Sequence, residues 1–143
     1  MNVEHILKIK GRNVVTAGTD ASVGAVIALM VSNGIGAVIV TDDAGRVAGI
    51  VSERDVVVCL AKSQRDLANA PVSELMTRKV VSCRLGNSVD ELMRTMTDRR
   101  IRHLPVIEDD RLIGVISIGD VVKFRVDELE SETRQLKDYI ERG

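Results

Sequence analysis

Two copies of a short polar pattern, a serine followed three residues later by an aspartate, are the residues of this chain best suited to chemistry. They are Ser52 with Asp55 and Ser117 with Asp120. A carboxylate only accepts hydrogen bonds and can receive two donors at once. A hydroxyl beside the free N–H groups of a helix start suits an anion. The alternative is structural: each serine caps a helix, and each aspartate favours its positive end.

The residues that usually carry catalysis or bind metals are few and scattered. His5 and His103 lie in different sequence contexts, so no Ser-His-Asp or Cys-His arrangement has support. Cys59 and Cys83 are not at metal-finger spacing. The chain also contains no Walker-type or GxGxxG loop. We therefore expect no catalytic residue, no metal site and no enzymatic activity.

The basic residues do not form a strong polyanion-binding pattern. Arg99, Arg100, Arg102 and Arg111 cluster, but the formal net charge is −1 and the pI is about 6.1. A chain with this charge has no global field that attracts nucleic acid. One Phe, one Tyr and no Trp weaken any role in binding single strands, which relies on aromatic stacking. We expect no nucleic-acid partner.

Nothing in the sequence resembles a targeting or membrane segment. Glu4, Lys8 and Lys10 interrupt any apolar run at the N-terminus, unlike a signal peptide. The longest apolar run, 34–40, is far too short to span a bilayer. Two cysteines in apolar surroundings suit a reducing compartment. We expect a cytoplasmic protein without a membrane partner.

The elements that position the Ser-x-x-Asp pairs are encoded twice. Val14-Val15-Thr16 reappears as Val80-Val81-Ser82, and a run from Gly49 to Val57 reappears from Gly114 to Val122. The spacing of the copies is 66 residues before Val40 and 65 after it, because the second copy lacks one turn residue. An internal repeat of this kind indicates two similar structural units.

Each copy predicts a β-α-β-β-α unit. The predicted strands are 13–17, 36–40 and 48–52 in the first copy and 79–83, 103–107 and 112–117 in the second. Asp20 and Asn87 are the predicted N-caps of the crossover helices, and a second helix begins at Asp55 or Asp120. The fold class is α/β (α+β), with the two units packed on each other as a pseudo-two-fold pair.

Two segments lie outside the repeated elements. The polar connection 60–70 leads to Pro71 and a short helix, 72–76. After the second copy, apolar residues alternate at spacings of four and three, from Val122 through Leu129 to Ile140. This long C-terminal helix either packs on its own domain or pairs with a partner helix. We divide the chain into repeats at 1–64 and 65–124 and a helical extension at 125–143.

These patterns resemble the CBS family, named after cystathionine β-synthase. The resemblance rests on Val72-Ser73-Glu74-Leu75-Met76-Thr77, on Ile101-Arg102-His103-Leu104-Pro105-Val106 and on the two segments Gly49–Asp55 and Gly114–Asp120. It implies that each aspartate accepts hydrogen bonds from both ribose hydroxyls of a nucleotide, while the serine faces phosphate. An acceptor-only carboxylate meets the requirement of a vicinal diol.

The resemblance also implies crossed sites, in which the aspartate of one copy faces strands of the other. The residues that it implies for site A are Ser52, Glu53, Arg54, Asp55, Ser82, Cys83, Ile101, Arg102, His103 and Pro105. Those for site B are Thr16, Ala17, Ile35, Gly36, Ala37, Ser117 and Asp120. Site B has Gly36 and Ala37 where site A has the basic pair, so it departs from the family pattern.

By this resemblance the chain is a regulatory sensor that binds an adenine nucleotide. We favour AMP, because a small basic cluster matches one phosphate; ADP, ATP, NAD(H) and S-adenosylmethionine are alternatives. The resemblance further implies a homodimer that acts on an unidentified effector protein. The competing hypothesis is a ligand-free structural or dimerisation module in which both aspartates only cap helices.

Overall fold

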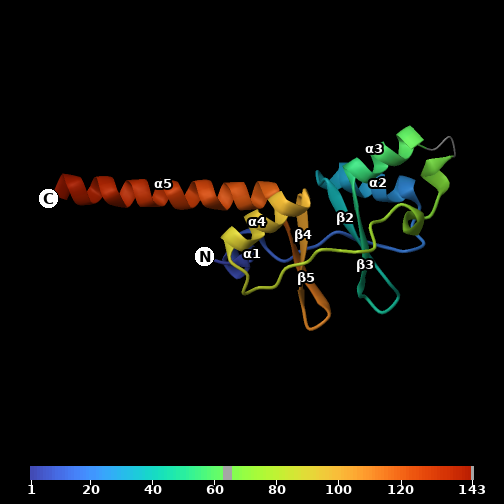
Figure 1. The fold of residues 1–143 in the computed structure, drawn as a ribbon, viewed down its shortest axis with the longest axis horizontal. Helices are drawn as coiled ribbons and strands as arrows, with labels where there is room; N and C mark the ends of the chain where they lie inside the picture. The colour runs from blue at the N-terminus through green and yellow to red at the C-terminus, as the bar shows by residue number, and fades with distance from the viewer. Residues whose placement is uncertain (63–65, 143) are drawn as a thin grey trace.

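The computed structural model describes residues 1–62 and 66–142 and shows two similar α/β halves side by side (Figure 1). The first half contains β1 (Thr16–Gly18), α2 (Val23–Asn33), β2 (Ala37–Thr41), β3 (Val47–Ser52) and α3 (Glu53–Lys62). The second contains α4 (Val89–Arg99), β4 (His103–Glu108), β5 (Arg111–Ser117) and α5 (Ile118–Arg142). The predicted α/β fold class and the repeat are therefore confirmed. The boundary expected between residues 64 and 65 lies outside the described residues.

The first half forms a three-stranded sheet. Its order is β1-β2-β3, with β1 parallel to β2 and β2 antiparallel to β3. Helix α2 makes the crossover that two parallel neighbours require. The order places Ser52, at the end of β3, directly opposite Ala37 at the start of β2.

The second half departs from the prediction, because residues 79–83 form no regular strand. Only Cys83 bridges to Val106, beside the β4–β5 hairpin. The next two backbone N–H groups bond to side chains instead: that of Arg84 donates to Asn87 Oδ1 at 2.7 Å, and that of Leu85 donates to Glu108 Oε1 at 2.9 Å. Side-chain acceptors thus replace the ladder that continues β1 in the first half.

The N-caps of the crossover helices also differ from the prediction. Ser22 and Ser88, rather than Asp20 and Asn87, accept the capping hydrogen bonds, each at 3.1 Å. Ser88 and Glu91 form a capping box. Since Asn87 already accepts from Arg84, the serine next to the helix takes the capping position.

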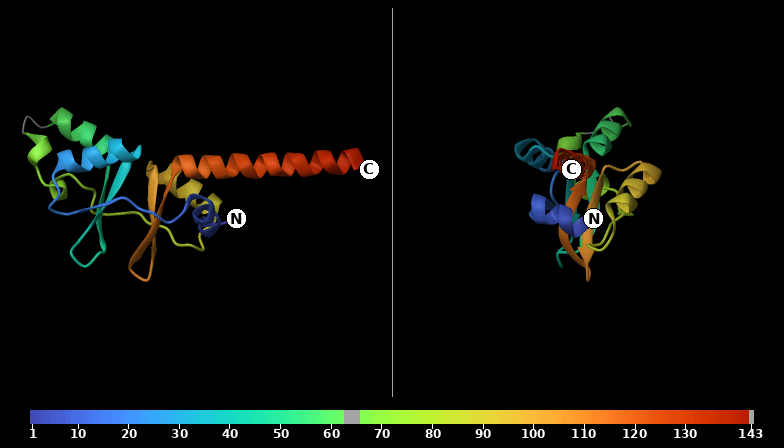
Figure 2. Two further views of the ribbon diagram at one scale, coloured as in Figure 1. Left: turned by 180° about the vertical axis from the view of Figure 1, so that it is seen from behind. Right: turned by 90° about the vertical axis from the view of Figure 1, so that its left-hand side faces the viewer.

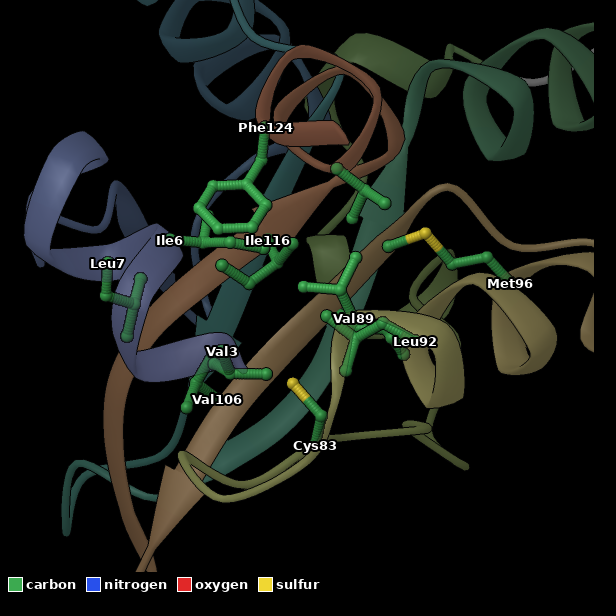
Figure 3. Close-up of a cluster of buried hydrophobic side chains, with 12 residues drawn as sticks. Val3, Ile6, Leu7, Cys83, Val89, Leu92, Met96, Val106, Ile116 and Phe124 are labelled. Atoms are coloured by element: carbon green, nitrogen blue, oxygen red, sulfur yellow. The ribbon is translucent and has the colours of Figure 1, made fainter. Parts of the chain in front are cut away.

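The segments that precede the two repeats cross over. Helix α1 (Val3–Lys10) packs on β5 and α5 of the second half, where Val3, Ile6 and Leu7 join the core (Figure 3). The short 3₁₀ helices η1 (Leu67–Asn69) and η2 (Val72–Glu74) lie against the first half, whose core contains Val72 and Met76. Helix α1, which precedes the first repeat, thus covers one face of the sheet in the second half. The segment with η1 and η2, which precedes the second repeat, covers one face of the sheet in the first half.

The second helix of repeat two and the C-terminal extension are one continuous helix, α5, of 25 residues. Only Val121 and Phe124 of this helix are buried, both near its start. The remainder projects away from the two halves (Figure 2). Among the described helices none is both long and apolar enough to cross a membrane.

Candidate functional site

Both Ser-x-x-Asp pairs form reciprocal caps at the start of a helix. The Ser52 N–H donates to Asp55 Oδ2 at 2.9 Å, and the Asp55 N–H donates to Ser52 Oγ at 3.3 Å. Ser117 and Asp120 make the matching bonds at 2.9 and 3.1 Å. The structural interpretation therefore accounts for both pairs. A ligand-binding role requires, in addition, a cavity and a carboxylate oxygen that remains open.

Asp55 lies on a cleft of about 670 Å³ between the two halves. The cleft brings together seven of the ten residues expected for site A: Ser52, Glu53, Arg54, Asp55, Ile101, Arg102 and His103. Asp55 Oδ2 also accepts from the Ser52 hydroxyl at 3.0 Å. Its other oxygen, Oδ1, has no hydrogen-bond donor within the described part of the chain. The carboxylate can therefore still accept from a ligand.

The other three expected residues lie outside this cleft. Ser82 is exposed, whereas Pro105 is buried and pairs with Val115 in the β4–β5 hairpin. Cys83 lies in the core of the second half, where burial raises the pKa of its thiol to about 12. The thiol is therefore uncharged and inert at neutral pH.

Sequence reasoning missed six residues that line the cleft, Ile50, Thr77, Lys79, Val80, Val81 and Arg100, and assigned a seventh, Gly36, to site B. Val80 and Val81 directly precede an expected site residue, so their position was a usable signal. Thr77 reaches the cleft because its backbone bridges to Ile50 in the other half, a contact that no sequence pattern indicates.

The cleft is predominantly basic on the side of the second half. Lys79, Arg100 and Arg102 line it there, opposite Asp55 and Glu53. Burial, and then the nearby Lys10 charge, lower the pKa of His103. The imidazole is therefore neutral at pH 7 and can donate one hydrogen bond rather than supply a charge. The cations of this cleft are therefore the arginine and lysine side chains.

The residues expected for site B are not gathered in one cavity. Ile35, Gly36 and Ser117 line a second cavity, of about 720 Å³, together with apolar residues of α2 and α3 and with Arg102 and His103, which also line the Asp55 cleft. Thr16 is exposed on β1, Ala17 is buried in the core of the first half, and Ala37 pairs with Ser52. Asp120 lines neither cavity and instead pairs with Lys10.

The fold and this cleft agree with a comparison against protein families. The family model "CBS domain" matches residues 4–62 and again 72–127. The chain therefore belongs to the CBS domain family and is a tandem CBS pair. CBS pairs are generally regulatory modules rather than catalysts.

Individual relatives are similar over most of the chain. The CBS domain-containing protein CBSX3, mitochondrial, of Arabidopsis thaliana is 33% identical over 99% of this chain and 72% of its own length. The crystal structure of the CBS-domain containing protein ATU1752 from Agrobacterium tumefaciens superposes with a TM-score of 0.84. It is 47% identical and covers 87% of this chain and 92% of its own.

A further structural neighbour was solved with adenosyl ligands. The CBS domain pair of MJ0100 was crystallised with 5′-methylthioadenosine and S-adenosyl-L-methionine. Its TM-score is 0.80 over 90% of this chain and 98% of its own, at 22% identity. At this identity the likeness shows a shared fold.

Proposed function

We propose that this chain is an adenine-nucleotide sensor, with AMP as the favoured ligand, and that the nucleotide binds in the Asp55 cleft. One observation carries the proposal: a single cavity holds an open carboxylate oxygen from one repeat and several cations from the other. A nucleotide presents complementary groups, a vicinal diol and a phosphate, separated by one sugar. The chain itself carries out no chemistry in this function.

Each part of AMP has matching residues. Asp55 Oδ1 would accept from the ribose hydroxyls, because a carboxylate can receive two donors. Arg102 and Arg100 would contact the phosphate through charge-assisted hydrogen bonds. Ile50, Val80 and Val81 would form apolar walls for the adenine, as small-ligand sites usually provide. The adenosyl ligands of the MJ0100 pair are consistent with this assignment.

We further propose that two chains form a homodimer through their helical faces. Val31 on α2, Val57 and Leu60 on α3 and Val122 on α5 are 53–78% exposed in the single chain. Exposed apolar residues gathered on one side of a protein mark an interaction surface. Nucleotide binding between the repeats would alter the affinity for an unidentified effector protein, which requires that ligand affinity differ between two states. The two free thiols support a cytoplasmic location.

A ligand-free dimerisation module is the second candidate. It is favoured by the reciprocal caps, which explain both Ser-x-x-Asp pairs without a nucleotide. The two candidates differ in whether the cleft is ever occupied.

Calorimetric titration of nucleotide-stripped protein with AMP, ADP, ATP, NAD and S-adenosylmethionine tests the sensor function. A ligand at 100 times its dissociation constant adds about 2.7 kcal/mol of stability. We therefore also expect a raised melting temperature with AMP and a smaller rise with GMP. If no adenosine ligand binds or stabilises the protein, the dimerisation module is the correct function.

A further inference from the structure

The two capping aspartates differ in one partner. The Lys10 ammonium, at the end of α1, donates to Asp120 Oδ2 and, at 2.7 Å, to the carbonyl oxygen of Val115. Asp55 has no cationic partner among the described side chains. The carboxylate of site B is thus paired with a cation of the same chain, whereas that of site A is not; the Oδ1 atom of each accepts no hydrogen bond from the described residues.

Lys10 occupies this position because the segments that precede the two repeats differ in structure. In the first half, Ile50 and Thr77 exchange two backbone hydrogen bonds, of 3.0 and 2.9 Å. Val115 is the repeat equivalent of Ile50, but α1 remains helical through Lys10 and ends at Gly11. The Lys10 ammonium therefore donates to the strand carbonyl that a backbone N–H satisfies in the first half.

The position of Lys10 decides what site B can accept. A ribose diol that approaches the Asp120 carboxylate meets this ammonium at Oδ2, while Oδ1 accepts no hydrogen bond from the described residues. Site B has Gly36 where site A has Arg102, but the cavity lined by Gly36 and Ser117 is also lined by Arg102, which could contact a phosphate there once Lys10 is removed. The side chains of Lys10 and Asp120 remain 30% and 25% exposed. Solvent screens an ion pair that is this exposed, so it is only moderately strong and the effect of removing it can be measured.

We infer that Lys10 is an internal occupant of site B and determines that each chain binds a single nucleotide. The inference rests on the proposed function of the Asp55 cleft. It predicts that removal of the Lys10 charge creates a second nucleotide site, because Asp120, like Asp55, then has no cationic partner among the described residues.

The test is a calorimetric titration with AMP of the wild type and of Lys10→Met, with Lys8→Met as the matched control on an exposed part of the same helix. Lys10→Gln removes the charge but keeps a donor for the Val115 carbonyl, so it controls for a loss of stability. The same changes in an Asp55→Ala background isolate site B. Thermal melts confirm that each variant is folded.

We expect one AMP per wild-type or Lys8→Met chain and two per Lys10→Met or Lys10→Gln chain. In the Asp55→Ala background, Lys10→Met should strengthen AMP binding about tenfold, which corresponds to about 1.4 kcal/mol. Addition of Asp120→Ala should abolish this gain. Two AMP molecules per wild-type chain, or an unchanged or weakened site B in both Lys10 variants, would overturn the inference and leave the proposed function intact. If the wild type and the Lys10 variants bind no adenine nucleotide, the proposed function fails and the inference fails with it.

Discussion

Asp55 and Asp120 cap equivalent helices, but Asp120 is paired with Lys10, whereas Asp55 has no cationic partner among the described residues. Asp55→Ala should weaken AMP binding about 30-fold or more, because each hydrogen bond to a charged acceptor contributes about 1.5–3 kcal/mol. Asp120→Ala, which removes the same type of cap, is the matched control and should change AMP affinity much less. Calorimetry measures both.

The nucleotide itself provides a second control for the aspartate prediction. 2′-Deoxy-AMP should bind the wild type more weakly than AMP and should bind Asp55→Ala as AMP does. If Asp120→Ala abolishes AMP binding while Asp55→Ala has no effect, the assignment of the ligand to the Asp55 cleft is wrong. If both variants bind AMP like the wild type, the sensor function is wrong as well.

Arg102 should distinguish the phosphate from the nucleoside. It lies on the cleft but is contributed by the opposite repeat from Asp55. Arg102→Ala should weaken AMP binding to an extent similar to Asp55→Ala, because a charge-assisted contact is lost. Uncharged adenosine should bind the variant about as well as it binds the wild type. An equal loss for both ligands in a titration would show that Arg102 does not contact phosphate.

His103 should make the stability of the protein depend on pH. Burial lowers its pKa below the ordinary value of 6.5, so the unfolded chain binds this proton more readily than the folded chain. The free energy of unfolding should therefore fall as the pH drops below about 6.5 and through the lower folded pKa. Urea denaturation at several pH values should show a shallower decline for His103→Gln. Identical declines in the two proteins would exclude this role.

At the scale of the elements, the repeat-equivalent residues Gly49 and Gly114 let the segments that precede the two repeats lie against the sheets. A Cβ at Gly49 would lie 2.7 Å from Met76 Sδ and 2.9 Å from the Thr77 carbonyl oxygen; one at Gly114 would lie 2.9 Å from Leu7 Cδ2. Gly49 and Gly114 thus have the same role in the two repeats. Any larger residue would force the crossing segment away from its strand.

Gly49→Ala should destabilise the fold by about 1–3 kcal/mol, the usual cost of overpacking. Gly114→Ala should cost less, because the end of the Leu7 side chain can move, whereas the Thr77 backbone is held by hydrogen bonds to Ile50. Urea denaturation measures the free energy of unfolding of each variant. Gly86→Ala, where an added Cβ meets nothing within 4 Å, is the control. Equal stability of all three variants would contradict the close approach.

At the scale of the whole molecule, the projecting part of α5 should contribute to the proposed homodimer as a parallel pair. Leu129, Leu136 and Ile140 are 56–66% exposed and lie at heptad spacing on one side of the helix. In a parallel pair, Glu132 of one chain and Lys137 of the other take the facing g and e positions. Without a partner helix, these apolar side chains would remain exposed to water.

A cysteine at Thr133, at the centre of the stripe, tests this geometry. In a parallel pair Thr133→Cys faces its own copy, so oxidation should link two chains into a covalent dimer. Ser131→Cys, on the outer side of the helix, is the control and should not link. Light scattering of the wild type should give about twice the chain mass of 15.6 kDa. A monomer at tens of micromolar would refute the homodimer, and a dimer without Thr133→Cys linkage would refute the parallel pairing.

The sequence by itself determined the family, the α/β class and most of the elements. The repeat indicated two similar units, in which Gly49 and Gly114 have the same role, and the signature segments indicated the family. The resemblance to the CBS family, rather than the repeat, predicted Asp55, Arg102 and His103 as one group, and the cleft brings them together. The predictions of a strand at 79–83 and of the two N-caps were wrong. Side chains such as Asn87 bond to the backbone in this region, and secondary-structure propensity alone does not describe that competition.

Only the tertiary structure decided how the two sites differ. Lys10 and Asp120 are separated by 110 residues, and no local pattern connects them. They meet because α1 crosses to the second half and presents its last residue to the strand carbonyl of Val115. The repeat predicts that Asp55 and Asp120 are equivalent, because it compares only the local sequence around each of them. Which of them pairs with a cation depends on long-range packing, and that packing is asymmetric because the first crossing segment is an α-helix and the second is a 3₁₀ turn.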